Sequence, residues 1–268
     1  MIMQRNKAIG IFDSGFGGLS LVKEIFKELP EEKIIYFADT ARCPYGVRSL
    51  MEVRQFVFEI TEFLLRNDVK LIVIACNTAT AAGLSAANTR FSIPIVGVIK
   101  SGAESAVKVS KNYRIGVIAT EGTIKSKAYQ TAINSLNSNL IIYGKECQQL
   151  VSLVEKGCTK GEEVKRKVIQ CLSPLLKEDI DTLVLGCTHF SFLEDMIKEV
   201  AGEGVTIVDP AIQTVKQVKN ILLSNKVNRI EREFPIHQFY TSGNIDTFKE
   251  IAEIFLGKSI VNIKHIKL

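Results

Sequence analysis

Two cysteines, Cys76 and Cys187, stand where a thiol could do acid–base chemistry. Each follows a short apolar run with the pattern of a buried strand, residues 71–75 and 183–185. An Ala-rich stretch at 79–87 follows the first thiol, which indicates a strand, a tight turn and a helix. Ligands bind at this edge of an open α/β sheet, and a helix N-terminus favours thiolate over thiol. Taken alone, either cysteine could instead be a small buried hydrophobe.

A thiol on each side of a small substrate suits a two-base reaction. One thiolate removes a proton from carbon, and the opposite thiol delivers a proton to the other face. The product has the mirror-image configuration, so the predicted chemistry is racemisation or epimerisation at a carbon acid. The separation of 111 residues between Cys76 and Cys187 does not pair them by itself, so the pairing depends on the architecture of the chain.

Several polar residues near these thiols could support the same chemistry. Asp13 directly follows a predicted strand and could accept a substrate ammonium, orient a thiol or cap a helix. His189 lies two residues past Cys187, where it could stabilise the thiolate, relay its proton or simply be hydrogen-bonded. Groups that could donate to carboxylates, or serve only as turns and caps, occur at Tyr45, Gly46, Asn77, Thr78 and Thr188.

An internal repeat supplies the architecture that would pair the thiols. The similar segments, in the same order, are 9–12 with 115–118, 34–36 with 141–143, and 71–76 with 182–187. These repeated segments predict two similar half-chains, each with one thiol at the ligand-binding edge of its sheet. The same repeat places Thr120 opposite Ser14.

Strands and helices alternate along the chain. We therefore predict two similar α/β domains with mainly parallel sheets, related by pseudo-symmetry, with the active site in the cleft between them. We assign residues 1–98 and 210–268 to the first domain and 99–209 to the second. The expected strands are 7–12, 33–38, 71–75, 93–98, 113–119, 140–143, 183–185, 205–208, 238–241 and 260–265.

Helix signals fill the intervals between these strands. The expected helices are 19–29, 49–67, 79–87, 101–110, 126–136, 149–156, 162–177, 211–224 and 245–256, with another after residue 191. Capping-box sequences begin at Ser49 and at Ser191. Residues 120–123 are expected to form a turn.

The composition excludes several classes of protein. With 46% hydrophobic and 24% charged residues over 268 positions, it is typical of a soluble globular chain. We expect the start of the chain to lead directly into a strand, with no signal peptide and no membrane span. Six cysteines without a C-x-x-C pair favour free thiols in the cytoplasm and argue against structural zinc. The net charge of +5 is dispersed, so we expect no nucleic-acid partner.

A dinucleotide-binding turn is the main competing interpretation of the first loop. Gly15 and Gly17 follow a strand, and Asp39 ends the next strand, as in a nucleotide fingerprint. The third glycine of that pattern is replaced by Ser20, and Asp13 would place negative charge beside a pyrophosphate. Both departures disfavour a nicotinamide cofactor.

The motifs resemble those of the glutamate racemases, a family within the cofactor-independent aspartate/glutamate racemase superfamily. The matching stretches are GIFDSGFGGLS at 10–20, DTARCPYG at 39–46, IACNTAT at 74–80, ATEGTIKS at 119–126, LGCTHF at 185–190 and TSGNIDTFKEIA at 241–252. They occur in family order and cover nearly the whole chain. Any one of them would be a weak signal, but the ordered set is specific.

The resemblance implies interconversion of L- and D-glutamate without pyridoxal phosphate or metal, supplying D-glutamate for peptidoglycan. It implies that Cys76 deprotonates D-glutamate and Cys187 deprotonates L-glutamate. It also implies Glu155 as an acidic partner on the Cys187 side, although nearby family prolines are replaced by Gln148 and Ser152. The implied substrate contacts are Asp13, Ser14, Tyr45, Gly46, Asn77, Thr78, Thr188 and His189.

We also expect a cytoplasmic homodimer, and we assign Cys43, Cys147, Cys158 and Cys171 to structural roles. One alternative activity is that of an aspartate racemase or another two-thiol isomerase, distinguished by the length of its substrate. A second alternative is a non-catalytic amino-acid-binding protein, distinguished by the absence of deuterium uptake at the α-carbon.

Overall fold

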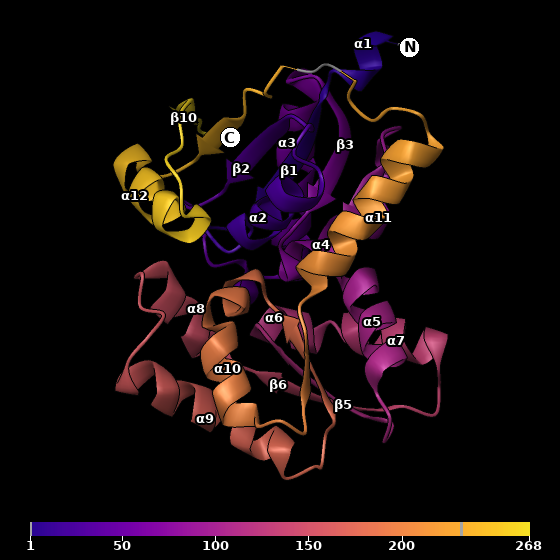
Figure 1. The fold of residues 1–268 in the computed structure, drawn as a ribbon, viewed down its shortest axis with the longest axis vertical. Coiled ribbons are helices and arrows are strands. Elements are labelled where there is room, and N and C mark those ends of the chain that lie inside the picture. Colours follow the sequence, from indigo (N-terminus) through magenta and orange to yellow (C-terminus); the bar gives the residue numbers. More distant parts are fainter. Residues whose placement is uncertain (1, 231–232) are drawn as a thin grey trace.

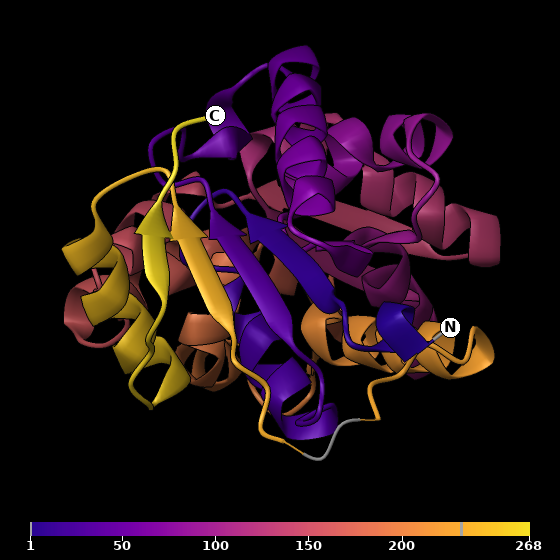
Figure 2. The same ribbon diagram turned by 90° about the horizontal axis from the view of Figure 1, so that it is seen from above.

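Two parallel sheets form the framework of the chain, whose computed structural model describes residues 2–230 and 233–268 (Figures 1 and 2). The larger sheet has the order β10-β9-β2-β1-β3-β4, and the smaller has the order β6-β5-β7-β8. The larger contains β1 (Ala8–Asp13), β2 (Ile34–Ala38), β3 (Val69–Ile74), β4 (Ile95–Gly97), β9 (Gln238–Thr241) and β10 (Ile263–His265). The smaller contains β5 (Arg114–Ala119), β6 (Ile141–Glu146), β7 (Thr182–Gly186) and β8 (Thr206–Val208).

The strand order confirms the internal repeat predicted from the sequence. The order β2-β1-β3-β4 recurs as β6-β5-β7-β8, and every strand pair within these two sets is parallel. The C-terminal segment adds β9 beside β2 and β10 beyond it. The two domains therefore present equivalent strand ends, and the α/β class with two similar parallel-sheet domains is confirmed.

Helices connect the strands and cover the sheets. They are α1 (Ile2–Arg5), α2 (Leu19–Glu28), α3 (Leu50–Arg66), α4 (Asn77–Arg90), α5 (Val98–Val109), α6 (Glu121–Lys125), α7 (Ala128–Leu136), α8 (Gln148–Glu155), α9 (Glu162–Leu176), α10 (Glu194–Ala201), α11 (Pro210–Ser224) and α12 (Ile245–Leu256). Two short 3-10 helices, η1 (Tyr45–Val47) and η2 (Thr188–Leu193), follow β2 and β7. None of the helices among the described residues is long and apolar enough to cross a membrane.

The central strands β1 and β3 of the larger sheet are buried throughout, and helices lie on both faces of the sheet (Figure 2), which explains the continuous apolar sequences of these strands. Side chains alternate between the faces along β1. Ile9 and Ile11 join the core that contains Val215 of α11, whereas Phe12 joins the core that contains Val57 of α3. Because β1 needs helices on both faces of the sheet to be buried, α11 is part of the packing of the larger sheet.

The N-cap half of the capping box at Ser49 is confirmed, because its hydroxyl accepts the Glu52 N–H at 3.2 Å, whereas the Glu52 carboxylate bonds Arg48. The one at Ser191 is wrong. Residue 191 lies inside η2, and its hydroxyl donates to Asp209 instead of capping α10, which begins at Glu194 with no side-chain cap. A tertiary hydrogen bond has replaced the local one.

Other local predictions also need correction. The chain enters β1 through the short helix α1, not directly. Residues 120–123 are not a simple turn, because Thr120 caps α6, and α7 then starts at 128 after Lys127 adopts a φ of 55°. Gly97 ends β4 and immediately precedes α5, so that helix starts at 98 and not 101. As a half-exposed edge strand, β6 continues through polar residues to Glu146.

We infer that the domain boundaries lie close to residues 98 and 209. β4 is the last strand of the larger sheet before the chain enters the smaller one, and β8 is the last strand of the smaller sheet. α11 then packs against both α2 and α5, so it joins the two parts (Figure 1). This placement supports the assignment of 1–98 and 210–268 to one domain and 99–209 to the other.

Candidate active site

The two thiols lie at equivalent strand ends and line one cavity. Cys76 connects β3 to α4, and Cys187 connects β7 to η2. Both side chains are buried. The predicted site residues that line the cavity with them are Ser14, Tyr45, Gly46, Asn77, Thr78, Thr188 and His189. Its empty volume, including the part open to solvent, is about 270 Å³.

Cys76 is the N-cap of α4. The N–H of Ala79 donates to its Sγ at 3.4 Å, so the thiol faces a helix N-terminus as predicted, although α4 begins at Asn77 and not at 79. Burial and the negative charge of Asp13 raise the pKa of Cys76 to about 12, although the Ala79 and Ser14 hydrogen bonds lower it. Cys76 is therefore a thiol at neutral pH, and a substrate cation nearby would favour its thiolate.

Cys187 has a cationic neighbour. Its Sγ lies 3.5 Å from Nδ1 of His189, and Nε2 of His189 is hydrogen-bonded to Oε1 of Glu155. Burial lowers the pKa of His189, but Cys187 and Glu155 outweigh burial and raise that pKa well above its usual range. The imidazolium held in this way places positive charge beside the Cys187 sulfur. The two thiols therefore differ in their electrostatic surroundings, although their backbone positions are equivalent.

Glu155 reaches the site from the end of α8. Besides His189, its Oε1 accepts the N–H of Phe16 at 3.3 Å. Gly15 leaves room for this approach, because a Cβ there would meet the Glu155 carboxylate. The Glu155 carboxylate thus links the second domain to the Gly-rich turn of the first domain, residues 14–18. This is the position expected for an acidic partner on the Cys187 side.

Asp13, the last residue of β1, is fully buried behind the cavity. Its carboxylate accepts the N–H of Gly15 at 3.0 Å and the hydroxyl of Thr188 at 3.1 Å. Burial raises the pKa of Asp13, although His189 and these two hydrogen bonds partly offset the effect. Because Thr188 belongs to the other domain, Asp13 connects the two strand ends and also acts on Cys76 through its charge.

Three threonine hydroxyls form a cluster at another wall of the cavity, and sequence reasoning did not identify this cluster. Thr78 Oγ1 lies 2.8 Å from Thr120 Oγ1 and 3.2 Å from Thr123 Oγ1. Asn77 Oδ1 accepts the hydroxyl of Tyr129 at 2.8 Å. Thr120 lines the cavity, and its position opposite Ser14 in the repeat was the signal that could have identified it. These bonds orient Asn77 and Thr78 from the second domain.

The η1 segment forms another wall through Tyr45 and Gly46. The Tyr45 hydroxyl donates to Asp39, and Arg42 bonds Asp39 at 2.6 Å, which fixes the loop to the end of β2. A Cβ at Gly46 would lie only 2.5 Å from Cβ of Thr120, so a larger residue would displace that wall. Sequence reasoning also missed Pro44 and Val151, which complete the lining.

The remaining cysteines differ in their surroundings. Cys147 and Cys171 are buried, and Cys158 is exposed. Cys43 lies close to Gly15, beside the Glu155 carboxylate, where burial and nearby negative charges raise its pKa far above the ordinary range. These surroundings support a structural role for Cys43 as a neutral thiol.

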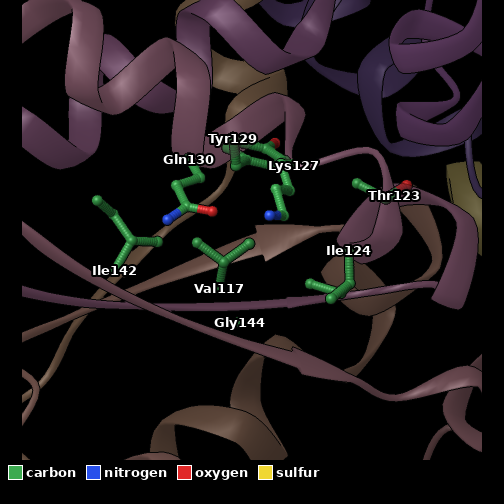
Figure 3. A pocket seen from close by; sticks show the side chains of 8 residues that line it. All are labelled: Val117, Thr123, Ile124, Lys127, Tyr129, Gln130, Ile142 and Gly144. Atoms are coloured by element: carbon green, nitrogen blue, oxygen red, sulfur yellow. The ribbon is translucent and has the colours of Figure 1, made fainter.

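A larger cavity lies between strands β5 and β6 on one side and the segment that contains α6 and α7 on the other (Figure 3). Its empty space is about 570 Å³. Figure 3 shows the Lys127 and Gln130 side chains above the apolar residues Val117 and Ile142. None of the described residues that line it is a thiol or a carboxylate, so it lacks the groups on which the predicted proton transfer depends.

Comparison with known sequences identifies relatives over the full chain. A family model described as Asp/Glu/Hydantoin racemase matches residues 9–218. The chain is 46% identical over 266 residues to a glutamate racemase of Bacillus cereus (strain ATCC 10987 / NRS 248), covering 99% of both proteins. It is 42% identical over 263 residues to a glutamate racemase of Listeria innocua, covering 98% of each.

Solved structures show the same fold. A crystal structure of a glutamate racemase from Bacillus anthracis has a TM-score of 0.95 and 44% identity, covering 98% of both chains. One from Francisella tularensis, in complex with D-glutamate, has a TM-score of 0.91 and 34% identity, again covering 98% of both. An aspartate racemase from Picrophilus torridus has a TM-score of 0.56 at 19% identity, over 85% of this chain and 97% of that one, so this likeness concerns the fold alone.

Proposed function

The chain belongs to the Asp/Glu/Hydantoin racemase family, and from this premise we propose that it interconverts L- and D-glutamate by two-thiol proton transfer. The observation that carries the proposal is the placement of Cys76 and Cys187 at equivalent strand ends, where both line one cavity. The identity to glutamate racemases over nearly the whole chain supports glutamate as the substrate.

In the direction from L- to D-glutamate, Cys187 acts as the base and Cys76 as the acid. The His189 cation beside the Cys187 sulfur and the burial of Cys76 fit these roles. Cys187 then removes the α-proton of L-glutamate, and Cys76 donates its proton to the opposite face of the carbanion to give D-glutamate. This leaves a Cys76 thiolate and a Cys187 thiol, which is the state that accepts D-glutamate for the reverse reaction.

Proton abstraction alone is insufficient, because the α-proton of an amino acid is a far weaker acid than a thiol. The site must also hold the substrate and stabilise the negative charge that develops at carbon. The fixed polar groups of Ser14, Asn77, Thr78 and Thr188 line the cavity and are suited to the carboxylates. Asp13 lies at the base of the same site and is suited to the substrate ammonium.

Circular dichroism of the purified protein with each glutamate enantiomer tests this function. We expect both enantiomers to approach one equilibrium mixture, with deuterium incorporated at the α-carbon in D₂O. Aspartate serves as the comparison substrate for the alternative of an aspartate racemase, which the sequence similarity does not favour. Binding without deuterium uptake would instead support the alternative of an amino-acid sensor.

We propose further that the enzyme supplies D-glutamate for peptidoglycan synthesis in the cytoplasm and acts as a homodimer. These proposals rest on the resemblance to the family. Light scattering of the purified protein tests the dimer, and rescue of a D-glutamate auxotroph tests the cellular role. A monomeric mass, or failure to rescue growth when the protein is expressed and active, would contradict the respective proposal.

A further inference from the structure

Gln148, the first residue of α8, carries an unusual polar side chain behind the wall of the site. Both polar atoms of its side chain, Oε1 and Nε2, are buried, and neither has a hydrogen-bond partner among the described residues. An unpaired buried amide is costly and calls for a partner. An amide can donate through Nε2 and accept through Oε1, so a ligand that brings a carboxylate could satisfy it.

The position of Gln148 connects it to the cavity. Its Oε1 lies beside Gly46, since a Cβ added to that glycine would be 2.6 Å from this oxygen. The same Cβ would be 2.5 Å from Cβ of Thr120. Gly46 and Thr120 both line the cavity, and so does Val151, which lies three residues further along α8. The amide is therefore packed directly against the cavity wall.

The charges of the site divide it into two regions. The Glu155 carboxylate lies against Gly15 and His189, and Asp13 bonds Gly15 and Thr188, so negative charge gathers around the Gly-rich turn. Thr120 in the cavity wall and Gln148 behind that wall contribute instead neutral hydroxyl and amide groups. An amino acid with a second carboxylate would place its ammonium toward the first region and its side-chain carboxylate toward the second.

We propose that Gln148 is a specificity-determining residue that donates a hydrogen bond from Nε2 to the side-chain carboxylate of the substrate. This rests on the proposed function, because it takes glutamate as the substrate. Proline, which the family resemblance leads one to expect at this position, has no donor, so the contact is a property of this chain. A contact to the side-chain carboxylate strengthens ground state and transition state alike, and therefore acts on KM more than on kcat.

Steady-state kinetics of Gln148→Leu and Gln148→Glu test the proposal. Gln148→Leu removes the donor, and we expect KM for both enantiomers to rise about ten- to hundredfold with kcat within a factor of about two. Gln148→Glu has the same shape and adds repulsion, so its KM should rise further. Gln149→Leu is the matched control on the same helix, because Gln149 bonds Cys171 at 2.9 Å and does not line the cavity.

Thermal unfolding of each variant shows whether it folds, and Gln148→Asn provides a smaller change if the others do not. An unchanged KM in the folded variants would overturn the proposal. So would equal KM values for the Leu and Glu variants, or a loss confined to kcat, which would indicate that α8 only positions Glu155. Inactivity of the unaltered protein toward glutamate would contradict the proposed function itself, and this outcome is distinguishable from all the others.

Discussion

Sγ of Cys187 and Nδ1 of His189 lie 3.5 Å apart, and the far side of the imidazole is bonded to Glu155. On one side of the cavity, a thiol, an imidazole and a carboxylate are thus connected by two successive side-chain contacts. On the other side, burial and the charge of Asp13 raise the pKa of Cys76, and hydrogen bonds from Ala79 and Ser14 lower it. The proposed mechanism, which runs in both directions, therefore relies on two thiols in unlike surroundings.

Replacement of either thiol should nearly abolish racemisation. Cys76→Ser and Cys187→Ser are each expected to lower its rate by about 10²–10⁴-fold, because a serine hydroxyl is a poor base. A substrate whose elimination requires only one proton abstraction should still turn over. The enantiomer preference should be opposite in the two variants, with D-configured substrate consumed by Cys187→Ser. Full racemase activity in either variant would eliminate the two-thiol mechanism.

The supporting groups should affect the two directions unequally. His189→Asn removes the cation beside Cys187, and Asp13→Asn alters the charge near Cys76. We expect each to lower kcat by about tenfold or more in one direction of deuterium-labelled initial-rate assays. The equilibrium constant must stay at unity because the products are enantiomers, so KM must change as well. If both variants raise only KM, with kcat intact in both directions, Asp13 and His189 are substrate anchors.

The buried carboxyl of Asp13 should make the fold more stable in acid. Because burial raises the folded-state pKa of Asp13 above its unfolded value, folding favours the protonated form. The stability this provides is present below about pH 3.9 and is lost as the pH rises through the folded-state pKa. Asp13→Asn should therefore increase the free energy of unfolding at pH 7.5, and the gain should shrink toward pH 4.5. Urea denaturation at both pH values provides the check, and a destabilised variant at pH 7.5 would contradict this account.

A buried ion pair should stabilise the first domain. Lys70 Nζ lies 2.6 Å from Glu32 Oε2, both side chains are almost fully buried, and the ammonium also donates to the carbonyl of Val227. Lys70→Met should lower the free energy of unfolding by about 3–5 kcal/mol, since Glu32 loses its cationic partner. Lys165→Met, which removes the exposed pair with Glu199, should cost only about 0–1 kcal/mol. If the two variants lost similar free energies of unfolding, burial would not be what makes the Lys70–Glu32 pair important for stability.

Activity should require neither pyridoxal phosphate nor metal. The two thiols supply both proton transfers, and the cavity lining contains no lysine that could form a Schiff base. Dialysis against a chelator and treatment with hydroxylamine should leave the racemisation rate unchanged. Loss of activity that is restored by added metal or pyridoxal phosphate would refute this prediction.

Short-range features followed from the sequence alone. Continuous apolar runs identified strands buried on both faces, and the Ala-rich stretch after Cys76 identified α4. The internal repeat related the two thiols, because equivalent segments form equivalent strand ends in parallel sheets. Such signals depend on residues a few positions apart, or on similarity between half-chains, and a sequence displays both directly.

The contacts that distinguish the two thiols were decided only by tertiary structure. Glu155 meets His189 because α8 packs against η2, and Asp13 meets Thr188 because strand ends from two different sheets adjoin. The same packing left the Gln148 amide buried without a hydrogen-bond partner among the residues that the structure describes. Local pattern carries no information about such pairs, since their geometry depends on how two separately folded sheets come together.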